Sequence, residues 1–220
     1  MARSLILRTA LGTCAIAALV AGCLALPKEH EVVFAVPPLD SRGTVPVRAG
    51  ILTLTDARPA NDRQSLTEWS DVAERATLQV LMDFSDARLF TTINHLSEPK
   101  GTDIVLRGEL RAFHWTPKYR WAPFIPGLAF LATLGVPVAS SDGHVEIALE
   151  IMDPVKAETI ASYDKAARAT QTYWVYRYQD GRAGSEIVVN GAFRQVTDQL
   201  QTAILDDRER IVAAVKPPAR

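Results

Sequence analysis

Residues that could carry out chemistry are few in this chain, and their spacing does not assemble a catalytic centre. The histidines stand singly, at His30, His95, His114 and His144. His114 and His144 fall near the facing ends of two expected strands, but two imidazoles make an incomplete zinc site, which takes three or four protein ligands. The chain also lacks Gly-x-Ser-x-Gly, His-Glu-x-x-His and any glycine-rich phosphate loop. We therefore expect no enzyme activity, no metal and no cofactor.

Charged residues cluster at one further place. Arg107 and Arg111 recur along one expected strand, and Glu146 and Glu150 recur along another. If these two strands pair, the side chains meet on the solvent face, either as an active site or as cross-strand ion pairs. Opposite charges across a strand pair stabilise the sheet modestly, and we favour this structural role.

Cys23 is the residue whose surroundings are most specific. Arg3 and Arg8 precede an apolar core over Thr9–Val20, and small residues then lead to the cysteine. This is the three-part layout of a secretory signal. Its ending, Leu19–Cys23 (LVAGC), resembles the bacterial lipobox, which implies cleavage before Cys23 and a diacylglycerol on its thiol. The alternative is a transmembrane anchor, but a core of about a dozen residues is shorter than the ~20 that span a bilayer.

The lipobox resemblance implies where the protein works. Residues 1–22 become a signal peptide, and residues 23–30 become a lipidated tether. Leu24 follows the cysteine where an aspartate would imply retention at the inner membrane, so the implied location is the periplasmic face of the outer membrane. In an organism without an outer membrane, the lipid would hold the protein at the plasma membrane.

Composition narrows the class of partner. The whole chain has a formal net charge of −1, and loss of residues 1–22 removes two arginines and leaves −3. No excess of positive charge is available to neutralise phosphates, so we expect no nucleic-acid partner. Cys14 lies in the signal, which leaves no cysteine pair for a disulfide in the exported part. No pattern in the sequence specifies an oligomeric state.

Residue periodicity predicts one α+β domain over residues 31–214, followed by a tail at 215–220. Strands are expected over residues 31–36, 45–55, 89–96, 103–115, 144–152 and 158–178, and helices over 66–84 and from about 185. Both helices carry an apolar stripe, which predicts that they cover one face of an antiparallel sheet. In the strand over 103–115, alternation puts Leu106 and Leu110 on the core face, and Arg107, Arg111 and Phe113 on the other.

A loop motif adds a second resemblance. The segment Thr55–Pro59 (TDARP) follows the second expected strand. Together with the order of strands and helices, it is similar to YajG-type envelope lipoproteins and to the fold of the TolB N-terminal domain, which also occurs in LpoB-like and CsgG-like lipoproteins. The resemblance implies no catalytic residues. We expect Asp56 to form an Asx turn rather than to do chemistry.

Trp121–Ala139 is 19 residues long and carries no charge, although it only has to join two strands. As one helix it would be roughly 28 Å long, close to the thickness of a bilayer core. Pro123, Pro126 and Pro137 argue against an unbroken helix. We call residues 119–141 the apolar insertion. Its side chains best suited to contact a membrane or a partner are Tyr119, Trp121, Phe124, Ile125, Leu128, Phe130, Leu131 and Leu134.

Three interpretations of the apolar insertion remain open. It folds back over the core or the open sheet face, it dips into the membrane that holds the lipid anchor, or it contacts another protein. Aromatic and basic residues at its start suit a membrane interface, and large apolar patches also mark protein contacts. We therefore expect a non-catalytic, lipid-anchored envelope protein that binds a membrane or an envelope protein. The alternatives are an accessory subunit of an envelope transport or secretion assembly, and a hydrolase acting on lipid or cell-wall material.

Overall fold

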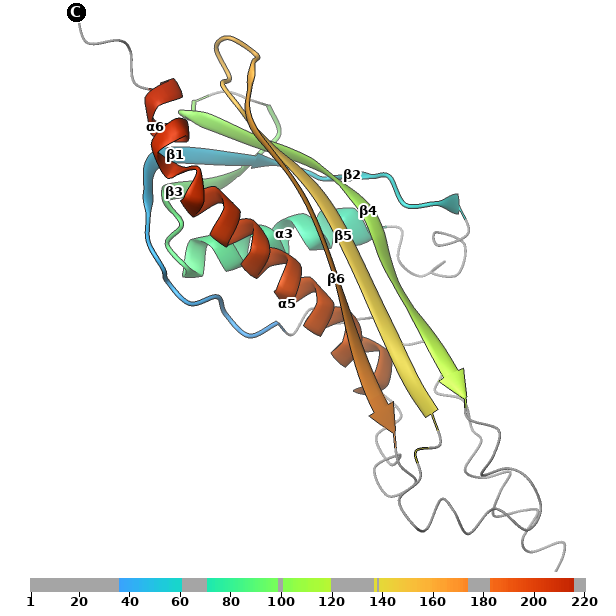
Figure 1. Cartoon of the computed structure of the whole chain (residues 1–220). Helices are drawn as coiled ribbons and strands as arrows, with labels where there is room; N and C mark the ends of the chain where they lie inside the picture. Colours follow the sequence, from blue (N-terminus) through green and yellow to red (C-terminus); the bar gives the residue numbers. More distant parts are fainter. Residues whose placement is uncertain are drawn as a thin grey trace, which may run out of the picture. The chain divides into compact units, whose positions relative to one another are not determined.

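The computed structural model describes residues 36–60, 71–98, 101–119, 137, 139–173 and 183–215. Within these residues the fold is α+β, as expected, with six strands and three helices (Figure 1). The strands are β1 Val45–Leu52, β2 Thr55–Asp56, β3 Phe90–Leu96, β4 Ile104–Tyr119, β5 Ala139–Met152 and β6 Thr159–Tyr173. The helices are α3 Val72–Asp86, α5 Ala183–Asp206 and α6 Arg208–Val215. The sequence did not predict α6.

The sheet is mixed rather than antiparallel throughout. Its order is β3-β1-β4-β5-β6, with β2 beside β4. The strands β4, β5 and β6 pair antiparallel as expected, but β1 runs parallel to both β3 and β4. The connection through α3 explains the direction of β3, because a crossover helix returns the chain to the end of the sheet from which it started. β4 then follows β3 after a short connection and keeps the same direction. The alternation of side chains does not encode this direction.

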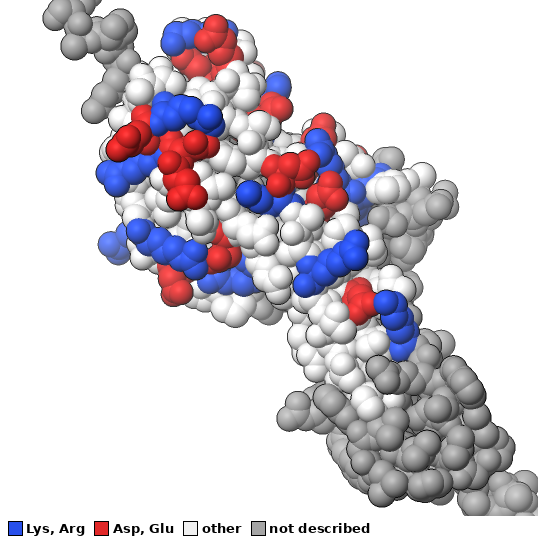
Figure 2. Space-filling model, in the orientation of Figure 1, with Lys and Arg blue, Asp and Glu red and all other residues white. Residues whose placement is uncertain are grey.

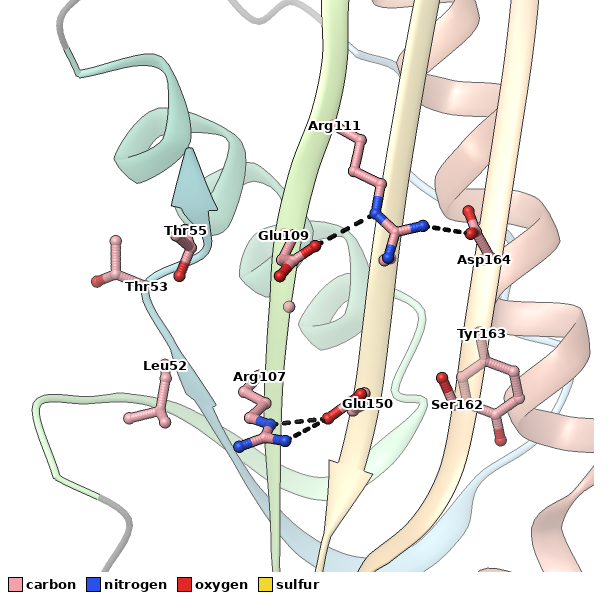
Figure 3. Close-up of a pocket in the computed structure, with 12 residues that line it drawn as sticks. Leu52, Thr53, Thr55, Arg107, Glu109, Arg111, Glu150, Ser162, Tyr163 and Asp164 are labelled. Carbon is pink, nitrogen blue, oxygen red and sulfur yellow. Dashed lines mark hydrogen bonds and ion pairs between the residues drawn. The ribbon is translucent and has the colours of Figure 1, made fainter. Parts of the chain in front are cut away.

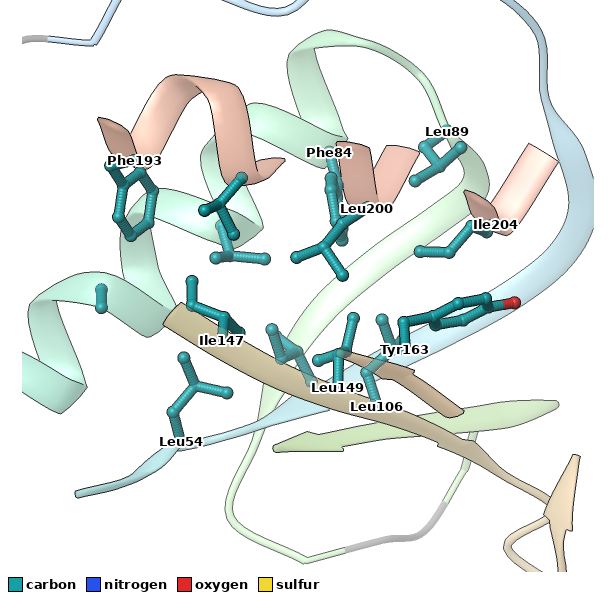
Figure 4. Close-up of a cluster of buried hydrophobic side chains, with 14 of the residues drawn as sticks. Leu54, Phe84, Leu89, Leu106, Ile147, Leu149, Tyr163, Phe193, Leu200 and Ile204 are labelled. Atoms are coloured by element: carbon teal, nitrogen blue, oxygen red, sulfur yellow. The ribbon is translucent and has the colours of Figure 1, made fainter. Parts of the chain in front are cut away.

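The apolar stripes of both predicted helices are buried against one face of the sheet (Figure 4). On α3 the stripe residues are at most 1% exposed; they are Val72, Ala76, Val80 and Phe84. On α5 they are fully buried; they are Val189, Phe193, Val196, Leu200 and Ile204. These residues share one core cluster with Leu106, Ile147 and Leu149 of the sheet. The other face of β4, β5 and β6 is left to polar side chains.

A β-bulge at Arg111 corrects one predicted orientation. Leu110 pairs with Ile147 and Ala112 pairs with Glu146, so Arg111 is an extra residue in β4. One inserted residue shifts the alternation of every residue that follows it. Phe113 is therefore fully buried in the core, whereas uninterrupted alternation put it on the solvent face beside Arg111.

At one end of the sheet, α5 packs against the long strands. Tyr119 of β4, Ala139 of β5 and Tyr173 of β6 lie at this end. We call this the distal end of the sheet; Tyr119 pairs with Ala139, which pairs with Tyr173. Gly143 lies beneath the first turns of α5, since a Cβ there would come within 2.6 Å of the Val188 carbonyl. The absence of a side chain at Gly143 thus lets α5 approach the sheet closely.

Candidate functional site

The open face of β4, β5 and β6 carries the charge cluster that the sequence singled out (Figure 3). Arg107 donates to Glu150 on the neighbouring strand, with Nη2 and Oε2 2.7 Å apart. The two residues are direct register partners, as expected. Arg111 was expected near Glu146 and Glu150. Its ion pairs are instead with Glu109 and Asp164, at 3.2 and 2.5 Å, although Glu146 is close enough for its charge to raise the pKa of Arg111.

These charges border a hollow of about 500 Å³ between the β1–β2 connection and the open sheet face (Figure 3). Thr53 and Thr55 line it from the side of β2, and Ser162 lines it from β6. The ion-paired side chains that line it are 35 to 58% exposed. At such exposure, water screens the charges and each pair contributes little to stability.

The chemistry available in this hollow is limited. Two hydroxyls of the hollow lie opposite a carboxylate on the neighbouring strand, because Thr55 pairs with Glu109 and Ser162 pairs with Glu150. The Glu150 carboxylate is already bonded to Arg107. The hydrogen bond from Arg111 to Glu109, together with the charge of Asp164, raises the pKa of Arg111 and keeps it cationic. The charged residues that line the hollow therefore pair with one another, within β4 and from β4 to β5 and β6, and no histidine or cysteine is among the lining residues.

His114 and His144 do come together, as their strands suggested. They are direct register partners, and their rings meet edge to face with centroids 5.3 Å apart. No group of three or more histidine, cysteine, aspartate or glutamate side chains in the described part of the chain is placed to hold a metal ion. The pair thus contributes a contact between β4 and β5 rather than a complete coordination site.

Asp56 and Arg58 confirm the expected Asx turn and add an ion pair that the sequence did not reveal. The backbone N–H of Arg58 donates to Asp56 Oδ1 at 3.1 Å. The guanidinium folds back onto the same carboxylate, with Nε to Oδ1 at 2.9 Å and Nη2 to Oδ2 at 2.8 Å. The Arg58 side chain is only 2% exposed. A nearly buried cation in an irregular loop has no sequence pattern of its own.

The predicted contact residues of the apolar insertion lie mostly outside the described residues. Tyr119 is the last residue of β4. The structure does not describe Cys23 or the other predicted contact residues, which are Trp121, Phe124, Ile125, Leu128, Phe130, Leu131 and Leu134. The strands themselves extend farther than predicted, β4 to Tyr119 and β5 from Ala139. Among the described helices, none is both long enough and apolar enough to cross a membrane.

The segment that precedes β1 attaches the N-terminal side of the domain to α5. Residues 36–44, which we call the strap, lie along α5. Arg194 donates to the carbonyl of Pro38 at 3.0 Å, and Gln201 donates to the carbonyl of Asp40 at 2.9 Å. Arg42 contacts Asp198 at 2.7 Å and Thr202 at 3.0 Å. These are contacts between residues more than 150 positions apart, which no local pattern predicts.

Comparison with known proteins gives likenesses of fold alone. No protein-family model matches the chain, and no curated protein sequence matches it. A Xanthomonas campestris protein of family DUF330 is 12% identical, with a TM-score of 0.43, over 77% of this chain and 88% of that one. A minor lipoprotein from Acinetobacter baumannii is 13% identical, with a TM-score of 0.32, over 84% of this chain and 99% of that one.

A PelC dodecamer from Paraburkholderia phytofirmans is also similar. It is 12% identical, with a TM-score of 0.38, over 74% of this chain and 92% of that one. At such identities and TM-scores, a likeness carries no inference about function, partner or oligomeric state.

Proposed function

We propose that this chain is a lipid-anchored, non-catalytic protein of the bacterial envelope that binds a membrane or an envelope protein through its apolar insertion. Cys23 carries the lipid and holds the domain at the periplasmic face of the outer membrane. Residues 1–22 are the signal peptide, residues 23–30 the tether, and residues 31–214 the binding domain.

The observation that carries this proposal is the pairing at the distal end of the sheet. Tyr119 and Ala139 are register partners in adjacent antiparallel strands. Such a pair can be joined by a turn of two residues, yet the chain supplies a long uncharged segment there. Because the sheet ends at this pair, the segment has to leave from the end of the domain. The hydrophobic core does not require this segment, since the described helices already cover the apolar face of the sheet.

Covalent lipidation is tested first. We expect a clickable fatty acid to label the wild-type protein in cells, and Cys23→Ser to abolish both the label and cleavage of the precursor. Cys14→Ser is the matched control and should leave the label in place, because Cys14 lies within the signal. A labelled Cys23→Ser protein would contradict the lipid-anchor proposal.

Binding through the apolar insertion is tested separately from the lipid. Purified residues 24–220 should still float with vesicles of phosphatidylethanolamine and phosphatidylglycerol. Alternatively, the same residues, exported behind a signal peptide that adds no lipid, should be captured by an envelope protein after crosslinking in cells. Flotation favours the bilayer, and capture without flotation favours a protein partner. If these residues neither float nor crosslink, the apolar insertion has no binding role.

A further inference from the structure

The strap fixes the direction in which the chain leads back toward Cys23. At one end of the strap, Gly43 lies next to Leu205, since a Cβ on Gly43 would be 3.4 Å from the Leu205 side chain. Near its other end, the Pro38 carbonyl accepts a hydrogen bond from Arg194. Eleven helical residues separate these two contacts, a distance of about 16 Å along α5. The strap therefore runs beside α5 from its C-terminal part to its middle.

The direction of α5 then decides which end of the sheet the strap approaches. Tyr163 donates to Asp207, just after the end of α5, at 3.0 Å. Ala169 lies next to Gly191, and Gly143 lies next to Val188. The N-terminal part of α5 thus covers the distal end of β5 and β6. Read backward, the strap heads toward that end.

The residues at the start of the strap keep it on this course. Pro37 and Pro38 fix their φ angles, and the residue before a proline is restricted to extended conformations. Twelve residues, 24–35, separate Val36 from Cys23 and can extend to about 40 Å. From the level of Arg194 to the first residue of α5 is only about 16 Å. A lipid on Cys23 can therefore reach past the distal end without any turn of the chain.

The distal end is also the least charged part of the long strands. In the last five residues of β4, β5 and β6 at this end, the only charged residues are Lys118 and Asp142. These two form an ion pair with each other, and Lys118 holds the pKa of Asp142 below its usual range. On the face shown in Figure 2, the coloured atoms nearest the grey ones at the lower right belong to one acidic and one basic side chain among white ones. Among the described strand residues of this end, this one ion pair is the charge that has to be desolvated when it approaches a lipid surface.

We infer that the domain stands on the lipid bilayer with its distal end, the end toward which the strap leads. The inference rests on the proposed lipidation of Cys23 and names the lipid bilayer as the surface bound. The turn between β5 and β6, where Val155 is 91% exposed, then points away from the membrane. Thr116 pairs with Asp142 of β5. From Asp142 to Met152, where β5 ends before the far turn, is ten residues, or about 33 Å along the strand.

Energy transfer to the membrane surface tests this orientation on the full lipidated protein. Single cysteines are introduced as Thr116→Cys near the distal end, Ser162→Cys partway along β6 and Val155→Cys in the far turn. All three positions are exposed, and the acylated Cys23 does not compete for the label. Each labelled protein is bound to phosphatidylethanolamine and phosphatidylglycerol vesicles that carry a headgroup acceptor dye, and only vesicle-bound protein is measured.

We expect transfer to fall in the order Thr116→Cys, Ser162→Cys, Val155→Cys, with severalfold more transfer from the first position than from the last. Equal transfer from all three would mean that the sheet lies flat, and the reverse order would mean that the domain is inverted; either overturns the inference. Protein that carries no lipid and does not bind vesicles contradicts the proposed function itself. The two failures are thus distinguishable, because only the first leaves the protein on the membrane.

Discussion

Two buried polar groups show how single residues in this fold depend on their surroundings. Asp83 of α3 is 1% exposed and accepts a hydrogen bond from Gln79 at 2.7 Å. Burial raises its pKa above the ordinary 3.8, although Gln79, Thr197 and Arg194 favour the ionised form. In contrast, the Asp56 carboxylate forms an ion pair with Arg58, whose side chain is itself only 2% exposed.

We expect Asp83→Asn to stabilise the domain at neutral pH. A raised pKa in the folded state means that folding favours the protonated carboxyl. The stability that the protonated Asp83 contributes is therefore full below about pH 3.8 and is lost as the pH rises through the pKa of the folded state. Asparagine removes the cost of burying a negative charge. Thermal unfolding should give a higher Tm for the variant at pH 7 and a difference that shrinks below pH 3.8. A lower Tm at pH 7 would mean that the ionised carboxylate is needed.

Asp56→Ala should destabilise the domain by about 3 kcal/mol. The substitution leaves the Arg58 guanidinium buried without its counter-charge, and breaking one side of such a pair is costly. Urea unfolding measures the change. Glu150→Ala is the control, because its partner Arg107 is 52% exposed and can be solvated, so the loss should stay within about 1 kcal/mol. Equal effects of the two substitutions would contradict the importance of burial at Arg58.

At the scale of elements, sequence periodicity predicted much of the fold. Both apolar stripes, the pairing of β4 with β5 and the Arg107–Glu150 contact follow from local spacing. Strand direction, the bulge at Arg111 and the helix α6 do not, because each depends on contacts between distant residues. The open-face charge cluster could be located from sequence, whereas the turn of Arg111 toward Asp164 could not, since one extra residue decides it.

The docking of α5 depends on a glycine in the strand beneath it. Gly143→Ala should destabilise the domain by about 1 to 3 kcal/mol, because the new Cβ would meet the Val188 backbone and force the helix outward. Gly191→Ala is the matched control within α5. Its Cβ would meet only Ala169 at 3.4 Å, and alanine favours a helix over glycine by about 0.5 to 1 kcal/mol. Denaturant midpoints should therefore move in opposite directions.

The buried stripe of α5 provides a second test at this scale. Phe193 and Leu200 are fully buried, so truncation of either to alanine should cost about 2 to 5 kcal/mol through lost burial and a residual cavity. Unfolding in urea measures the loss. Ile187, also on α5 but 50% exposed, serves as the control, and Ile187→Ala should cost much less. A negligible change for Phe193→Ala would mean that α5 contributes little to the fold.

The whole domain is asymmetric along its strands. The core residues lie where α3, α5 and α6 cover the sheet. The distal end carries uncharged polar residues, one ion pair and the attachment points of the apolar insertion. Beyond the distal end the chain continues into the apolar insertion, whereas the covered part of the sheet supplies the core. Substitutions beyond the distal end should therefore change association without unfolding the domain.

Replacing Phe130 and Leu131 together by aspartate tests that separation. If the apolar insertion enters a bilayer, each new charge meets a penalty of roughly 2.5 to 3.5 kcal/mol at the membrane centre and less near the interface. Vesicle flotation of residues 24–220 should then fall sharply, while the thermal melt stays unchanged. Val155→Asp adds a charge at an exposed apolar residue of the far turn and should alter neither measurement. If the insertion instead covers the core, the double variant buries unpaired charges, so a lowered Tm with unchanged flotation would overturn the membrane role.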